Sequence, residues 1–364
     1  MLGDDDAPFP YMRWAKRHLT GHAPSNLGMS GIPTVSPSDL PLPREIGYWA
    51  PEGEYGDAAL RAAIASRYGV PVDRVFATAG TSLANFLVYL TFARGAHVAV
   101  ETPAYQSLPA TAAAVGARLS VFSRDESRGW RIDPASLERA VTKETRLLAV
   151  TDLHNPSGAR LHADDLALLL SCAERVDAAV LVDEVYLELA LLPAKTAALR
   201  SDRVIVTNSL TKAHGLGGLR IGWILAHPSR IAAIAGWNDL VSPAHGVPSI
   251  AIATSYLPRA DAFLAKTKAL IPPRLDRIDA WVRARRDVSW VKPAGGITGF
   301  LRLPAGMDGD RLAEHAATAH GVRVIPGSFF QAKDHVRISY GLPEADLDLA
   351  LESLGRALDD ALRW

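Results

Sequence analysis

The stretch SLTKAHGLGGLRIG, residues 209–222, places a lysine among small and hydroxyl-bearing residues. Lys212 follows an apolar run, RVIVTN, and Arg220 stands eight positions after it. A lysine at the end of a buried strand loses part of its hydration, so the pKa of its amine falls and the amine can act as a nucleophile. The hydroxyls of Ser209 and Thr211 and the guanidinium of Arg220 suit a phosphate dianion. These residue types indicate an amine nucleophile beside a phosphate site.

Two other interpretations of this stretch exist. A lone lysine beside a glycine-rich turn is usually a solvated surface group. The glycines also suggest a dinucleotide-binding loop, but Gly215 and Gly217 would require a third glycine at position 220, where Arg220 stands. The dinucleotide interpretation therefore fails on spacing.

The segment resembles the Schiff-base signature of the class I/II aminotransferase family, Ser-x-Ser/Thr-Lys followed by Gly-Leu-x-Gly-x-Arg-x-Gly. The matching residues are Ser209, Thr211, Lys212, Gly215, Leu216, Gly218, Arg220 and Gly222. The resemblance implies an enzyme that carries pyridoxal 5′-phosphate (PLP) as a Schiff base on Lys212. It further implies that Ser209, Thr211 and Arg220 bind the cofactor and that Lys212 moves the Cα proton. We expect no metal ion at this site.

The family places a phosphate-binding turn and an aromatic ring before the lysine. Here TAGTSLANF supplies Gly80, Thr81 and Ser82 just before a helical pattern, where backbone N–H groups suit a phosphate. By itself such a turn is weak support, because Ser or Thr at a helix start is ordinary. In ETPAYQS, the resemblance implies that Tyr105 stacks on the cofactor ring.

Two further motifs come between that ring and the lysine. Asn155 lies in HNPSG, and Asp183 and Tyr186 lie in AVLVDEVY. An acid at the end of a buried strand is costly unless it is paired. The resemblance implies that Asp183 faces the pyridine nitrogen of PLP, and that Asn155 and Tyr186 share its phenolate oxygen.

The resemblance also implies a substrate site. Arg337 in HVRISYG would bind the substrate α-carboxylate with its guanidinium fork, and Asn155 would assist it. Gly31 in NLGMSGIPT would cover the substrate. We find no second arginine to hold a side-chain carboxylate, so strict aspartate specificity is not expected.

A tyrosine from the partner subunit binds the cofactor phosphate in this family, which implies a homodimer with shared active sites. Tyr48 and Gly53 have the family's mutual spacing, but Leu60 and Arg61 then follow three residues late. Tyr55 lies closer to the predicted helix and competes for the role. We favour Tyr48.

Seven apolar runs of strand length are available to position these residues. They are RVFATAG, HVAVETP, RLSVFS, LLAVTDLHN, AVLVDEVY, RVIVTNSL and IGWILAH, and most are separated by helical patterns. Such alternation predicts an α/β fold with a mainly parallel sheet and helices on both faces. Ligands of such sheets bind at the carboxyl ends of the strands. The resemblance implies fold type I of the PLP-dependent transferases, with a seven-stranded sheet and a smaller α+β domain.

Long helical patterns and short strands after residue 262 predict that second domain. We expect residues 46–261 to form the large PLP-binding domain, and residues 1–45 plus 262–364 to form the small one. The net charge of the 364 residues is zero, with no basic block, which gives no reason to expect a nucleic acid or a membrane as partner. No signal peptide or membrane-spanning run is present, and Cys172 is the single cysteine, so we expect a cytoplasmic protein.

The resemblance implies a PLP-dependent aminotransferase of amino acid metabolism that acts on an α-amino acid and a 2-oxo acid. Alternatives of the same fold are a lyase, a decarboxylase or an amino-acid cyclase, because the same residues serve all of these reactions. The N-terminal stretch also resembles aminotransferase-like cyclases of antibiotic biosynthesis. A PLP-binding regulator without turnover is a remote alternative, since the chain has no spare length for a DNA-binding module.

Overall fold

The large sheet contains all seven strands that the alternation predicts, and the two-residue β4 extends one edge in the order β1-β8-β7-β6-β5-β2-β3-β4. The computed structural model describes residues 8–19, 25–33, 35–40, 55 and 57–364. The five strands β3, β2, β5, β6 and β7, in this order across the sheet, pair in parallel. Strand β8 runs antiparallel between β7 and β1. The strands are β1 (Val75–Thr78), β2 (His97–Thr102), β3 (Arg118–Asp125), β4 (Arg131–Ile132), β5 (Thr145–Thr151), β6 (Ala179–Asp183), β7 (Val204–Ser209) and β8 (Gly222–Leu225). The predicted mainly parallel sheet is confirmed.

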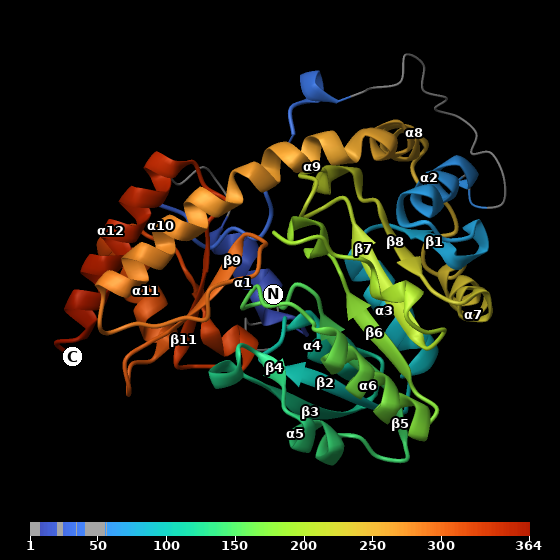
Figure 1. The fold of residues 1–364 in the computed structure, drawn as a ribbon, viewed down its shortest axis with the longest axis horizontal. Coiled ribbons are helices and arrows are strands. Elements are labelled where there is room, and N and C mark those ends of the chain that lie inside the picture. The colour runs from blue at the N-terminus through green and yellow to red at the C-terminus, as the bar shows by residue number, and fades with distance from the viewer. Residues whose placement is uncertain (1–7, 20–24, 34, 41–54, 56) are drawn as a thin grey trace.

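Helices cover both faces of this sheet (Figure 1). Val180 and Val182 of β6 point into one core, whereas Ala179 and Leu181 of the same strand point into the other, as the two-residue period of a strand requires. One face carries α3 (Thr81–Phe92), α4 (Ser107–Ala114) and α7 (Pro228–Asn238), and the other carries α2 (Ala58–Tyr68), α5 (Pro134–Ala140), α6 (Ala163–Arg175) and α8 (Val247–Tyr256). Within the described ranges, no helix is long and apolar enough to cross a bilayer.

A second, antiparallel sheet has the order β10-β11-β9. Its strands are β9 (Thr298–Arg302), β10 (Ile325–Pro326) and β11 (His335–Ser339), and the helices of this part are α1 (Pro10–His18), α9 (Ala260–Ala269), α10 (Ile271–Ala284), α11 (Gly309–His320) and α12 (Glu344–Ala361). Helices α9 and α10 run from the large sheet toward the small one (Figure 1). Leu27 of the N-terminal segment lies in the same core as Leu301 and Leu354. On this packing we propose the division into residues 46–261 and residues 1–45 plus 262–364.

Candidate active site

The carboxyl ends of β6 and β7 meet at a cavity of about 570 Å³. Gly80 and Gly31 adjoin it, because a Cβ on Gly80 would lie 2.6 Å from Arg220 Nη2, and one on Gly31 would lie 3.8 Å from Lys212 Cδ. Most of the predicted site residues line the cavity: Thr81, Ser82, Tyr105, Asn155, Asp183, Tyr186, Ser209, Thr211, Lys212, Arg220 and Arg337. The fold therefore gathers side chains that are spread over most of the sequence.

Tyr55 does not line this cavity of its own chain. Its hydroxyl donates to Asp239 Oδ1 at 2.8 Å, just after the end of α7, and its ring packs edge-on against Phe76. Tyr48, the other tyrosine predicted to reach a partner subunit, lies outside the described residues.

Lys212 lies in the turn after β7, and its amine donates to Ser30 Oγ at 2.8 Å. Burial lowers the pKa of Lys212 to about 8, the positive charge of Arg337 adds to this effect, and the negative charge of Asp183 opposes it. An amine with this pKa is partly neutral near pH 7, so it can act as a nucleophile or a base. Ile32 N also donates to the Lys212 carbonyl at 3.3 Å, which ties the turn to the N-terminal segment.

Asp183 ends β6, which pairs with β7, the strand that precedes the turn with Lys212. Asn85 Nδ2 donates to its Oδ2 at 2.8 Å, and Val185 N donates to its Oδ1 at 3.1 Å. Burial raises the pKa of Asp183 to about 6, although both hydrogen bonds and Lys212 oppose the rise. The carboxyl is therefore held in one orientation, and in the protein without cofactor it keeps its proton up to about pH 6.

This pKa makes the stability of the cofactor-free protein depend on pH. The folded state holds the Asp183 proton more tightly than the unfolded state does, so this proton stabilises the fold. The stabilisation is fully present below pH 3.8, the ordinary pKa of an aspartate, and is lost as the pH rises through about 6. As the pH rises from 4 to 8, we expect the free energy of unfolding of Asp183→Asn, measured with urea, to increase by about 2 kcal/mol relative to that of the wild type. Asp164→Asn, at a carboxylate whose side chain is 93% exposed, is the control. A gain for Asp183→Asn that is the same at every pH would contradict this prediction.

The turn between β1 and α3 faces the guanidinium of Arg220. Arg220 Nη2 donates to Ala79 O at 3.0 Å, and the backbone of Arg220 has a φ of +53°, a strained value for a residue with a Cβ. Thr81 Oγ1 is buried, and no group in the described part of the chain bonds to it. The N–H groups that begin α3, an unpaired hydroxyl and a guanidinium thus converge on a site for an anion.

Arg337, in β11, is a fully buried cation. Its Nη1 donates to Asn155 Oδ1 at 3.1 Å, and its Nη2 donates to Tyr11 Oη at 3.1 Å and to Gly28 O at 3.4 Å. Within the described ranges, its Nε has no hydrogen-bond partner and no carboxylate forms an ion pair with Arg337. A buried cation that contacts only neutral groups leaves room for a negatively charged ligand.

Tyr186 and Tyr105 also face the cavity. Tyr186 Oη donates to the Ser30 carbonyl at 2.6 Å, so the backbone and side chain of Ser30 contact both Tyr186 and Lys212. The ring of Tyr105 packs edge-on against Tyr11 and Phe9. Burial raises the pKa values of Tyr186 and Tyr105 well above those of a free tyrosine, which keeps both hydroxyls protonated.

The sequence interpretation missed several residues that line this cavity, and two of them hold charged groups of the site. Asn85 holds Asp183, and Tyr11, from α1, holds Arg337. A polar residue on the apolar face of a predicted helix, as in SLANFLVYL, is a signal that could have indicated Asn85. Tyr11 lies in a segment with little periodicity, and we find no sequence signal for it.

A protein-family model described as aminotransferase class I and II matches residues 53–354. This match spans most of the chain and both sheets. The chain belongs to this family. It is a PLP-dependent enzyme, as the resemblance of its lysine motif implies.

Relatives within the family include enzymes with different names. The chain is 32% identical to a capreomycidine synthase of Streptomyces vinaceus, over 83% of this chain and 79% of that protein. It is 28% identical to an arginine–pyruvate transaminase of Pseudomonas aeruginosa, over 78% of this chain and 76% of that protein. A solved PLP-dependent aminotransferase from Streptococcus suis has a TM-score of 0.87 at 24% identity and covers 97% of both chains. The solved PLP-dependent cyclase OrfR has a TM-score of 0.85 at 25% identity, over 98% of this chain and 97% of that chain.

The cavity has the groups that PLP requires. Lys212 supplies an amine of lowered pKa and Asp183 supplies an acid of raised pKa. Thr81 Oγ1 and Arg220 supply donors for a phosphate, and the hydroxyl lacks any partner in the described part of the chain. The residues present therefore fit the cofactor of the family.

Proposed function

We propose that this enzyme transfers an amino group between an α-amino acid and a 2-oxo acid, with Lys212 as the residue that holds PLP. One observation carries the proposal: Arg337, a buried cation without an acidic partner in the described ranges, shares a cavity with the Lys212 amine. Burying an unpaired charge is costly, and the α-carboxylate of an amino acid supplies the missing partner. The amino group of such a substrate then enters the cavity that contains Lys212.

The other cavity residues have binding roles in this proposal. With PLP bound, Asp183 would keep a proton on the pyridine nitrogen, Tyr105 would contact the ring, and Asn155 and Tyr186 would bind the phenolate oxygen. Asn155 also assists Arg337 at the substrate carboxylate, because its Oδ1 already accepts a hydrogen bond from Arg337. Gly31 leaves space over the lysine, since it lies beside the Lys212 side chain. The phosphate is bound by Gly80, Thr81, Ser82, Ser209, Thr211 and Arg220.

Lys212 is also the proton carrier of the proposed reaction. When bound, PLP supplies an electron sink for the charge that forms at the substrate Cα. Lys212 takes the Cα proton and returns it, a role that its lowered pKa supports. Arg337 would fix the carboxylate and so the orientation of the bonds at the substrate Cα.

A cyclase is the second candidate, and a specific observation favours it. The relative with 32% identity is named a capreomycidine synthase, and the structure with a TM-score of 0.85 is a PLP-dependent cyclase. The same lysine, acid and arginine serve both reactions, because cyclisation also begins with removal of the Cα proton.

A donor screen that identifies products separates these functions. Purified protein with PLP is mixed with each amino acid, including arginine derivatives, with and without a 2-oxo acid. An aminotransferase yields a new oxo acid together with a new amino acid and requires the acceptor. A cyclised product that forms without the acceptor would replace the aminotransferase proposal by the cyclase.

We also propose a cytoplasmic homodimer with shared active sites. Leu240 and Val241, which follow the Asp239 partner of Tyr55, are 77% and 49% exposed in the single chain. Large apolar side chains that are exposed together support a subunit contact at this position. In this arrangement Tyr48, or Tyr55 in its place, reaches the phosphate in the partner.

Hybrid dimers test the shared site. A Tyr48→Phe homodimer should bind PLP about 10-fold more weakly, because it loses a hydrogen bond to a charged phosphate. A hybrid of Tyr48→Phe with Lys212→Ala contains one complete site, so we expect it to bind one PLP with wild-type affinity. The same homodimer and the same hybrid with Lys212→Ala are made with Tyr55→Phe as the matched control. Restored affinity only in hybrids with Tyr55→Phe would assign the role to Tyr55, and restoration in neither hybrid would contradict sharing.

A further inference from the structure

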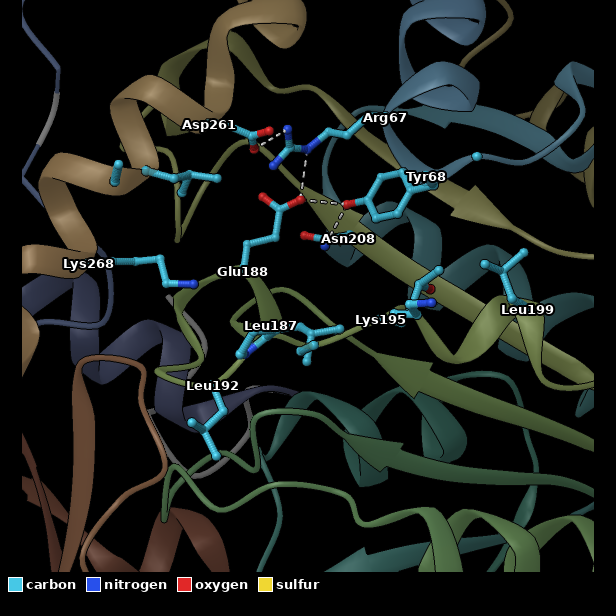
Figure 2. A pocket seen from close by; sticks show the side chains of 16 residues that line it. Arg67, Tyr68, Leu187, Glu188, Leu192, Lys195, Leu199, Asn208, Asp261 and Lys268 are labelled. Carbon is cyan, nitrogen blue, oxygen red and sulfur yellow. Dashed lines mark hydrogen bonds and ion pairs between the residues drawn. The ribbon is translucent and has the colours of Figure 1, made fainter.

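Glu188 lies on the wall of a second cavity, of about 790 Å³, lined by the end of α2, residues 187–199 and α9. Figure 2 shows its carboxylate pointing toward Arg67 and Tyr68. The side chain of Glu188 is only 12% exposed, and it does not line the cavity that contains Lys212. Any effect of Glu188 on the lysine is therefore transmitted through other residues.

Three groups from two parts of the fold converge on this carboxylate. Its Oε1 accepts from Arg67 Nε at 2.9 Å and from Tyr68 Oη at 3.0 Å (Figure 2). Its Oε2 lies 2.5 Å from His214 Nε2, in a close contact without hydrogen-bond geometry. Burial favours a raised pKa for Glu188, but His214 and Arg67 outweigh it and hold the pKa below its usual range. The carboxylate is therefore ionised throughout the neutral range.

One branch of these contacts reaches the residues before the lysine. Tyr68 Oη accepts from Asn208 Nδ2 at 3.2 Å, and Asn208 Oδ1 accepts from Ser209 N at 2.7 Å. Asn208 and Ser209 end β7, and the turn with Lys212 begins directly after them. Glu188 thus fixes the strand end on one side of the lysine.

The other branch reaches the residues after the lysine. His214 is buried two positions after Lys212, and its Nδ1 lies 3.0 Å from Tyr256 Oη of α8. The ring is therefore fixed between Tyr256 and Glu188. A single carboxylate thus restrains both sides of the turn that carries Lys212.

We infer that Glu188 is a positioning residue for Lys212, because it fixes the chain on both sides of the lysine through Asn208 and His214. The inference rests on the proposed role of Lys212 as the residue that holds PLP. If both sides are restrained, the amine occupies one place in the cavity and binding PLP needs no ordering of the turn. Loosening either side then weakens PLP binding and changes the surroundings of the amine.

Several other groups around the carboxylate carry charge or titrate. They are Arg67 and Tyr68 (α2), Glu184 (after β6), Lys195, His214, Tyr256 (α8), and Asp261 and Lys268 (α9). Asp261 provides a matched control, because it contacts the same Arg67 at 2.9 Å, with its own side chain 90% exposed. Asp261 hydrogen-bonds to Arg67, and Arg67 lies on neither of the two branches that lead to Asn208 and His214.

The test compares Glu188→Gln with Asp261→Asn as full-length protein with PLP. Glu188→Gln should raise the dissociation constant of PLP about 10-fold and shift the pH midpoint of the visible band of the bound cofactor. Asp261→Asn should retain wild-type values for both. The melting temperature without PLP is measured for each variant, because a merely structural role would move it and leave the midpoint of the band unchanged. Wild-type affinity and midpoint in Glu188→Gln, or equal changes in Asp261→Asn, would overturn the inference.

Two milder variants keep the test decisive if Glu188→Gln does not fold. Tyr68→Phe removes the link to Asn208, and His214→Asn removes the contact on the other side. Each should shift the midpoint of the band away from the wild-type value and weaken PLP binding, and wild-type behaviour of both would overturn the inference. A wild-type protein that forms no visible band with PLP would instead contradict the proposed function of Lys212, so the two failures are distinguishable.

Discussion

Replacing Lys212 with alanine should lower kcat/KM by about 10⁴-fold or more, because the variant loses both the covalent hold on PLP and the proposed proton carrier. The amine that it removes is the one whose pKa burial lowers to about 8. Steady-state kinetics with a donor from the screen measures the loss. Reduction of the wild-type holoenzyme with borohydride should also attach the cofactor mass to the peptide that contains Lys212.

Lys268→Ala is the matched control for this experiment. Lys268 lies on α9, is partly exposed, and lines the second cavity but not the cavity that contains Lys212. Its removal should leave both kcat/KM and the visible band at wild-type values. Turnover of Lys212→Ala at the wild-type rate, or cofactor mass on another lysine, would refute the assignment of Lys212.

Replacing Arg337 with methionine should lower kcat/KM about 10²- to 10³-fold, because the substrate carboxylate loses its buried cation. The same change should raise the stability of the cofactor-free protein by about 1 to 3 kcal/mol. Arg337 is fully buried, and its hydrogen-bond partners in the described part of the chain are neutral, so an apolar side chain of similar length removes an uncompensated charge. Urea unfolding and kinetics on one preparation measure both effects.

Arg302 supplies the contrast, since it belongs to β9, which pairs directly with β11. Its side chain is 47% exposed, and its guanidinium forms ion pairs with Glu126 and Asp334. Arg302→Met should therefore leave kcat/KM unchanged and cost at most about 1 kcal/mol of stability. A destabilised Arg337→Met with normal KM would show that Arg337 supports the fold instead of binding substrate.

The elements of the large sheet were predictable because their signals are local. Each of the seven apolar runs is a strand of this sheet, and the residues at the carboxyl ends of β6 and β7 face the cavity. All five side chains of β6 are buried, as the uninterrupted apolar run AVLVD indicates for a strand covered on both faces. Only β4, with two residues, was not predicted, and a strand of that length has no pattern to detect.

The predicted site residues were recognised because several motifs occur in one order, although each motif alone is weak. The lysine motif, the acid of AVLVDEVY and the arginine of HVRISYG come together in the structure in a single cavity. Tyr48 stays a prediction, as it lies outside the described residues, and Tyr55 contacts Asp239 in its own chain. The role of each residue at the cofactor is likewise a proposal.

The sequence alone determined the family, the cofactor and the large sheet, because apolar periodicity and motif spacing are properties of short segments. Only the tertiary structure decided how the site is held together. Asn85 reaches Asp183 across 98 residues, Tyr11 reaches Arg337 across 326, and Glu188 contacts both α2 and His214. Contacts of this kind depend on how distant elements pack, and a polar residue that meets its partner only after folding has no local pattern to reveal it.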